Sequence, residues 1–134
     1  AIQNNIFDGN ESELGGAIYA LTHRGSITLE NNQITNNDAY WSGGVNLIST
    51  DGDIYVRDNI ISNNTATEKD GAIFSSTSSG AAYEQVYSGN VIEGNSSHQG
   101  SGAIYIDASS DNKIQINNNL ISGNSLNAPS ELYD

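Results

Sequence analysis

Carboxylates are the side chains of this chain best suited to chemistry, because two close together can act as general acid and base or hold a divalent cation. The candidate pairs are Asp51 with Asp53, in the segment DGD, and Asp107 with Asp111. Both pairs lie in turn-like sequence, where Asp is common because its side chain bonds to nearby backbone. We therefore expect these carboxylates to serve turns, with no catalytic residue, no metal site and no cofactor.

A polysaccharide-cleaving site would also need a basic group at a fixed place beside the carboxylates. The basic side chains share no common place along the chain's repeats; they are Arg24, Arg57, Lys69, Lys113, His23 and His98. The net charge of −12, from 16 Asp and Glu against 4 Lys and Arg, would also repel a polyanionic substrate. We expect no enzyme, and a carbohydrate-active enzyme ranks third among the functions considered.

The amino-acid composition limits the classes of partner that the protein can bind. Nucleic acids and anionic membrane surfaces are bound by clustered basic residues, which this acidic chain lacks. No run approaches 18 apolar residues, so we expect no membrane insertion. There is no Cys and no Met, and the chain starts at Ala1, as a processed mature chain or an excised fragment would.

Five copies of one motif organise the whole sequence. Each has the form x-Asn-x-apolar-x-x-Asn, and the copies are NNIFDGN (4–10), NNQITNN (31–37), DNIISNN (58–64), GNVIEGN (89–95) and NNLISGN (118–124). A second motif keeps step with the first, as GGAIY (15–19), GGVNL (43–47), DGAIF (70–74), SGAIY (101–105) and a decayed PSELY (129–133). A third, apolar-x-apolar, precedes most of the asparagine motifs, although the fourth copy has Gln85 and Tyr87 in those places.

Each repeat therefore contains three short strand-like pieces separated by Gly, Asn, Asp and Ser, the residues that form turns. One repeat cannot bury its own apolar face, but stacked repeats can pair their strands and share a core. The sequence predicts an all-β, single-domain, right-handed parallel β-helix of about five coils with three short strands each. The expected coils are approximately 1–24, 25–51, 52–81, 82–111 and 112–134.

The motifs GGAIY with NNIFDGN, DGAIF, and SGAIY with NNLISGN resemble the repeats of polymorphic outer membrane proteins and related autotransporter passengers. The resemblance covers nearly the whole chain. It implies a right-handed parallel β-helix displayed at a cell surface, acting as an extracellular scaffold or adhesin, and it carries over no catalytic residue.

The repeated asparagines predict structural ladders. Identical amides stacked at the roughly 4.8 Å spacing of paired strands can pass hydrogen bonds along the stack. One expected ladder is Asn5, Asn32, Asn59, Asn90 and Asn119; the other is Asn10, Asn37, Asn64, Asn95 and Asn124. Of the three Asn-x-Ser/Thr sequons, at Asn10, Asn63 and Asn95, only Asn63 lies off the ladders, so it is the candidate glycosylation site.

The strand after the glycines has two alternating columns, of which one points inward. One is Ile18, Asn46, Ile73, Ile104 and Leu132; the other, the expected outward interface stripe, is Tyr19, Leu47, Phe74, Tyr105 and Tyr133. Either register leaves an apolar stripe outside, which usually marks a partner surface. Tyr40 and Trp41 precede one copy and would extend the stripe or cover it.

The leading functional hypothesis is a structural extracellular or cell-surface subunit that assembles head to tail with copies of itself into a filament or surface layer, because no capping element is visible at either end. The axial contacts would be Ile2 and Phe7 at one end, and Ile121, Leu132 and Tyr133 at the other. The alternative is an adhesin segment that binds a surface protein or glycan through the stripe.

Overall fold

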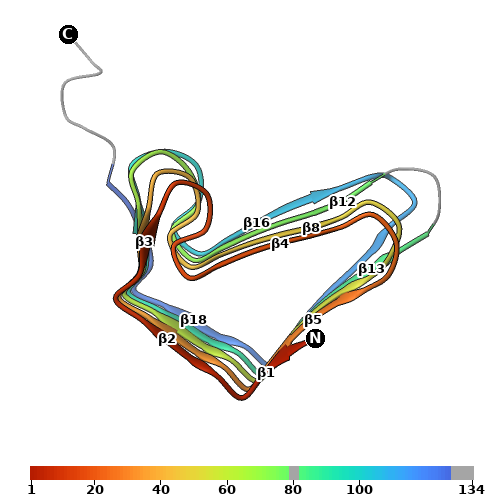
Figure 1. Cartoon of the computed structure of the whole chain (residues 1–134), viewed down its shortest axis with the longest axis horizontal. Helices are drawn as coiled ribbons and strands as arrows, with labels where there is room; N and C mark the ends of the chain where they lie inside the picture. Colours follow the sequence, from red (N-terminus) through yellow and green to blue (C-terminus); the bar gives the residue numbers. More distant parts are fainter. Residues whose placement is uncertain (79–81, 128–134) are drawn as a thin grey trace, which may run out of the picture.

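The computed structural model describes residues 1–78 and 82–127, and within them the regular structure is all strand. The chain winds in stacked coils around one interior (Figure 1), and the strands form four parallel sheets. Sheet 1 consists of β1 (Ile2–Gln3), β5 (Ile27–Glu30), β9 (Ile54–Arg57), β13 (Glu84–Ser88) and β17 (Lys113–Asn117). Sheet 2 consists of β2 (Ile6–Asp8), β6 (Gln33–Thr35), β10 (Ile60–Ser62), β14 (Val91–Glu93) and β18 (Leu120–Ser122).

The other two sheets complete each coil. Sheet 3 consists of β3 (Glu11–Ser12), β7 (Asp38–Ala39), β11 (Thr65–Ala66), β15 (Ser96–Ser97) and β19 (Ser125–Leu126). Sheet 4 consists of β4 (Ile18–Thr22), β8 (Val45–Ser49), β12 (Ile73–Thr77) and β16 (Ile104–Ala108). The predicted β-helix is confirmed, with the three expected strand positions in sheets 1, 2 and 4; the last strand expected in sheet 4, at 129–133, lies outside the described residues. Sheet 3 adds strands of two residues, too short to show an apolar period in the sequence.

The corners between sheets depend on a left-handed residue placed directly before each ladder asparagine. Between sheets 1 and 2, φ is 59° at Asn4, 54° at Asn31 and 55° at Asp58. Gly9, Asn36, Asn63, Gly94 and Gly123 have the same conformation between sheets 2 and 3. Asn, Asp and Gly adopt this region at the lowest cost, which explains why they recur there.

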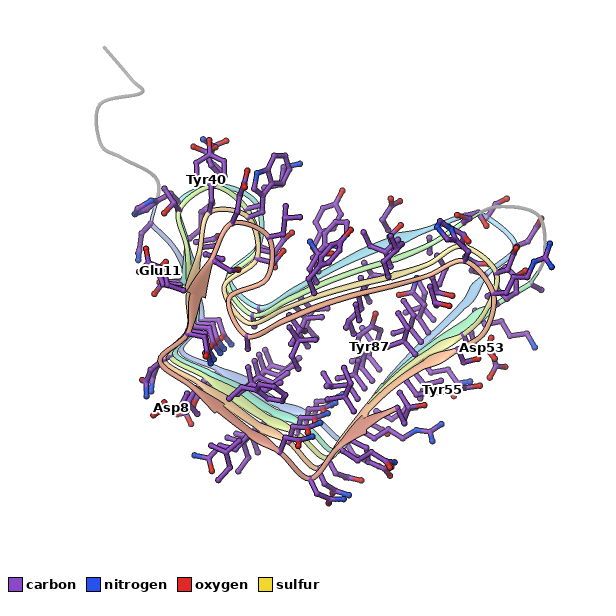
Figure 2. All side chains as sticks on the ribbon, in the orientation of Figure 1. Asp8, Glu11, Tyr40, Asp53, Tyr55 and Tyr87 are labelled. Atoms are coloured by element: carbon purple, nitrogen blue, oxygen red, sulfur yellow. The ribbon has the colours of Figure 1, made fainter. Side chains whose placement is uncertain are left out.

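The core consists of inward columns that repeat from coil to coil. Ile34, Ile61 and Ile92 pair in register across sheet 2, and all three are fully buried. The fourth coil breaks the pattern in sheet 1, where Gln85 and Tyr87 pair with Ile54 and Val56 and point inward; Figure 2 shows Tyr87 in the interior.

Gln85 and Tyr87 are hydrogen-bonded to each other and to side chains of β12 in the core. The Tyr87 hydroxyl donates to Gln85 Oε1 at 2.7 Å, and Gln85 Nε2 donates to Thr77 Oγ1 at 2.9 Å. Ser75 Oγ also donates to Gln85 Oε1 at 3.0 Å. Because a buried polar group is costly only when it lacks a hydrogen bond, this network makes the substitution tolerable.

The register of sheet 4 corrects part of the sequence alignment. Val45 pairs with Ile18 and Ile73, which places Leu47 beside Ala20 and Ser75. The second coil has Gly44 where the other coils have Ala17, Ala72 and Ala103. Aligning the motif GGVNL with GGAIY on their glycine pairs was therefore wrong by one residue. The glycine that repeats at the same position of each coil is Gly16, Gly43, Gly71 and Gly102, and Gly44 is not part of this column.

These glycines are required by close backbone approach and not by a left-handed φ. A Cβ built on Gly71 would lie 2.6 Å from the carbonyl oxygen of Gly102 in the next coil. Such a contact is too short for any side chain. The turns between sheets 3 and 4 arch outward and return to the start of sheet 4 at this point (Figure 1).

Candidate functional site

The outer face of sheet 4 presents one column of large side chains, which we call the outer column: Tyr19, Asn46, Phe74 and Tyr105. The prediction that Leu47 belongs to the outward stripe is wrong. Leu47 is fully buried in the core because of the one-residue register difference. Asn46 takes its place outside, but is itself buried, with Nδ2 donating to the Leu14 carbonyl at 3.4 Å. Tyr133 and Leu132, also predicted contacts, lie outside the described residues.

Phe74 and Tyr105 form a parallel aromatic pair in consecutive coils. Their ring centroids are 5.7 Å apart and their planes differ by 8°. The Tyr105 side chain remains 48% exposed, and β16 is the edge strand of sheet 4 among the described residues. One face of the Tyr105 ring therefore packs against Phe74, and the opposite side has no described strand beside it.

A cleft of about 420 Å³ lies beside this pair, over the third and fourth coils, and we call it the lateral cleft. Its walls come from the outer face of sheet 4 and from the arched turns before β12 and β16. The lining residues are Lys69, Asp70, Phe74, Gln99, Gly100, Tyr105 and Asp107. Its volume lies within the range of small-molecule sites, roughly 300–1,000 Å³.

The two carboxylates of the lateral cleft differ in accessibility. Asp70 is only 1% exposed, and its Oδ1 accepts the Ser101 N–H of the next coil at 3.2 Å. Burial raises the pKa of Asp70 to about 6. Asp107 is exposed, and its Oδ2 accepts from Ser76 Oγ at 3.3 Å. Asp70 thus holds a turn against its neighbour, whereas Asp107 is free to contact a ligand.

Two cations of the chain lie over aromatic rings. The Lys69 Nζ lies 4.3 Å from the centroid of Trp41, on the turn of the preceding coil, and Trp41 contacts Tyr40 at 6.2 Å between centroids. The Arg57 guanidinium lies 4.3 Å from the centroid of Tyr55. Tyr40 and Trp41 lie in the turn between β7 and β8 and do not join the outer column; Figure 2 labels Tyr40 on the arched turn.

The carboxylates singled out in the sequence are not brought into one site. Asp53 accepts from Tyr55 Oη at 3.0 Å and from the Glu84 N–H at 2.8 Å. Asp51 accepts from Tyr83 Oη at 3.2 Å, which places both at the corner between sheets 4 and 1. Asp107 was expected in a turn but lies within β16, whereas Asp111 is exposed in the turn that follows, as expected. Among the residues that the structure describes, no three His, Cys, Asp or Glu side chains are grouped to hold a metal ion.

Two asparagine ladders run the length of the solenoid. In the first, side-chain amides donate from each coil to the next at 3.2, 3.0, 3.0 and 2.9 Å, through Asn5, Asn32, Asn59, Asn90 and Asn119. In the second, the distances are 2.8, 2.8, 2.9 and 2.8 Å, through Asn10, Asn37, Asn64, Asn95 and Asn124. Every bond points the same way, from the lower-numbered coil to the higher.

The remaining predicted residues lie at the ends and corners of the solenoid. Ile2 and Phe7 are partly buried in the first coil, and Ile121 is 45% exposed in the fifth. Asn63 is exposed at a corner, whereas the sequon asparagine Asn95 is fully buried within its ladder. A glycan on Asn95 would therefore require the ladder to break.

Sequence reasoning missed Asp70 and Gln99 as cleft residues. Asp70 precedes the repeated glycine of its coil by one residue and Gln99 precedes that of its coil by three, in sequence that resembles other turns. A signal was available: turns at corresponding places of consecutive coils must stack, so their side chains meet on one side of the solenoid.

The fold and its ladders define a parallel β-helix solenoid with a lateral aromatic cleft. Residues 1–130 match the family model described as "Right handed beta helix region". The chain belongs to this right-handed β-helix family. No curated protein and no solved structure matches it. Among the described residues, no helix is long and apolar enough to cross a membrane.

Proposed function

We propose that the protein is an extracellular or cell-surface binding scaffold, in which a rigid β-helix presents the lateral cleft to a ligand. The observation that carries the proposal is the Phe74–Tyr105 pair, with an exposed ring and an exposed carboxylate, Asp107, in one cleft. Aromatic rings beside a few polar groups are the usual lining of binding sites.

Binding fits this cleft better than catalysis does. Acid–base hydrolysis needs two carboxylates facing the same bond. Of the two here, Asp70 is 1% exposed and hydrogen-bonded to the next coil. Asp107 alone does not provide the second group.

The test compares two tyrosines of the outer column. Melting temperatures are measured with a probe panel of lysine, spermidine, glucose and glucosamine, because a ligand that binds only the folded state raises the melting temperature. At a ligand concentration 100 times Kd the stabilisation is about 2.7 kcal/mol. We expect at least one probe to stabilise the wild type and Tyr19→Ala, and none to stabilise Tyr105→Ala. If both variants lose the stabilisation by the probe, or if no probe raises the melting temperature of the wild type, the proposal is contradicted.

A second candidate function is a subunit that assembles end to end with copies of itself into a filament or surface layer. The polarity of the ladders favours it. Nothing described donates to Oδ1 of Asn5 or Asn10 in the first coil, while the amides of Asn119 and Asn124 face no further described asparagine. One end therefore offers acceptors where the other offers donors.

Sedimentation of the 134-residue chain at rising concentration tests this candidate. Because each copy carries a net charge of −12, assembly should strengthen as salt screens the repulsion. We expect large species that Ile2→Lys prevents without unfolding the chain. Filaments formed normally by Ile2→Lys would contradict end-to-end assembly.

A further inference from the structure

Negative charge dominates the surface, and most of the chain's own cations are already engaged. The sequence has 16 acidic and 4 basic side chains. Lys69 and Arg57 lie over aromatic rings, and Lys113 Nζ is 3.8 Å from Glu84 Oε1. The resulting field attracts cationic groups from solution.

The β9 strand shows how this protein holds a cation. Tyr55 and Arg57 are alternate residues of β9 on the outer face of sheet 1, and Asp53 directly precedes the strand. Its hydroxyl donates to Asp53, and its ring is covered by the Arg57 guanidinium at 4.3 Å from the centroid. The aromatic face thus holds a cation supplied by the chain itself, while the neighbouring carboxylate accepts from the hydroxyl of the same ring.

The lateral cleft has the same two acceptors without the cation. Tyr105 and Asp107 are alternate residues of β16, so both side chains stand on its outer face, and both are exposed. The nearest basic side chain lining the cleft, Lys69, has its ammonium over Trp41. The face of the Tyr105 ring and the Asp107 carboxylate are therefore both available to a cation from outside the chain.

We propose that the lateral cleft binds a lysine side chain of a partner protein, with the ammonium between the open face of the Tyr105 ring and the Asp107 carboxylate and the aliphatic arm along the edge of the stacked rings. A lysine fits because its apolar stem can lie against aromatic surface while its charged head stays near water and carboxylate. This inference rests on the proposed binding function and names its ligand class.

The test is a calorimetric titration with two probes, the peptide Ac-Gly-Gly-Lys-Gly-Gly-amide and its twin with norleucine in place of lysine. Norleucine keeps the aliphatic arm and removes the ammonium. We expect a millimolar Kd for the lysine peptide and at least fivefold weaker binding of the norleucine peptide. Equal affinity for the two peptides overturns the inference.

Two matched variants localise the effect. Asp107→Asn and Asp111→Asn remove the same charge from exposed positions four residues apart, one inside the cleft and one outside. We expect Asp107→Asn to weaken binding of the lysine peptide about 2–5-fold, the range of an exposed ion pair, because the Tyr105 ring is retained, and Asp111→Asn to change it less than twofold. Equal weakening by both variants would show a general charge effect and overturn the site.

A third variant and a third probe complete the design. Lys69→Met removes the competing positive charge of the cleft wall, so it should lower the Kd of the lysine peptide several-fold. Glucose separates failure of the inference from failure of the proposed function. If glucose binds in the cleft and the lysine peptide does not, the lysine assignment is wrong while a binding role stands. If neither binds and no probe of the melting panel stabilises the protein, the proposed function fails as well.

Discussion

Removing one ladder amide in the middle of the solenoid tests how much the stacked asparagines stabilise the fold. Asn64 is fully buried and makes four side-chain hydrogen bonds. Its Oδ1 accepts from Asn37 N at 3.0 Å and from Asn37 Nδ2 at 2.8 Å, while its Nδ2 donates to the Ile34 carbonyl at 3.0 Å and to Asn95 Oδ1 at 2.9 Å.

In Asn64→Ala all four of these bonds are lost, but not every partner is stranded. Asn37 Nδ2 keeps the Phe7 carbonyl, and Asn95 Oδ1 keeps the Asn64 backbone N–H. The Asn37 N–H loses its acceptor in a buried place, which costs roughly 1–3 kcal/mol, and the weakened partners add to this. We expect a total loss of roughly 2–4 kcal/mol, measured as the free energy of unfolding in urea.

The neighbouring residue supplies the control. Asn63 is exposed, and its φ of 55° suits glycine, so Asn63→Gly avoids the backbone strain that alanine would introduce there. We expect Asn63→Gly to change the free energy of unfolding by less than about 1 kcal/mol. Equal losses in Asn64→Ala and Asn63→Gly would refute the reasoning about the ladder.

Three further predictions concern the core, the glycines and pH. Gly71→Ala should lower the melting temperature far more than Gly9→Ala, because a Cβ on Gly71 meets the Gly102 carbonyl at 2.6 Å while one on Gly9 has nothing within 4 Å and only its left-handed φ to strain it; similar shifts would contradict this. Gln85→Ile alone should destabilise the protein because Tyr87 and Ser75 lose the acceptor that they share, whereas adding Tyr87→Val and Ser75→Ala should recover much of the loss in a urea titration, since removing all three polar groups leaves none of them buried without a partner. The pKa of Asp70 is raised to about 6 in the folded state, against about 3.9 when unfolded, so its contribution to stability is greatest below pH 4 and is lost as pH rises through 6. The difference in melting temperature between wild type and Asp70→Asn should therefore shift towards the wild type on acidification from pH 7 to pH 4, and a pH-independent difference would show that Asp70 does not titrate there.

The sequence predicts the fold well because strand pairing repeats the same physical requirement in every coil. Asn32 and Asn59 fall in register since each must meet the amide of the next coil, and Ile34 and Ile61 must fill the same place in the core. The register of sheet 4 was harder to predict. Its glycines mark a close backbone contact, and in the second coil both Gly43 and Gly44 make one, so the sequence does not show which of them aligns with the single glycine of the third and fourth coils.

The sequence indicates that successive turns stack on one side of the solenoid, but not that they enclose a cleft there. Its walls come from turns of variable length, whose course depends on how the arches before β12 and β16 pack together. Phe74 and Tyr105 were visible as a stripe, but the polar residues beside them, Asp70 and Gln99, have no spacing that separates them from other turn residues. Side-chain positions in stacked turns are fixed by three-dimensional packing.

Mapping amide chemical shifts of the isotope-labelled protein during titration with the lysine pentapeptide tests the central claim most directly. If the lateral cleft is the binding site, the largest shifts fall at Lys69, Gln99, Gly100, Tyr105 and Asp107, and the exposed outer face of sheet 2 at Ile6 and Ile60 stays unchanged. Shifts that gather on sheet 2, or that spread evenly over the acidic surface, would contradict the account.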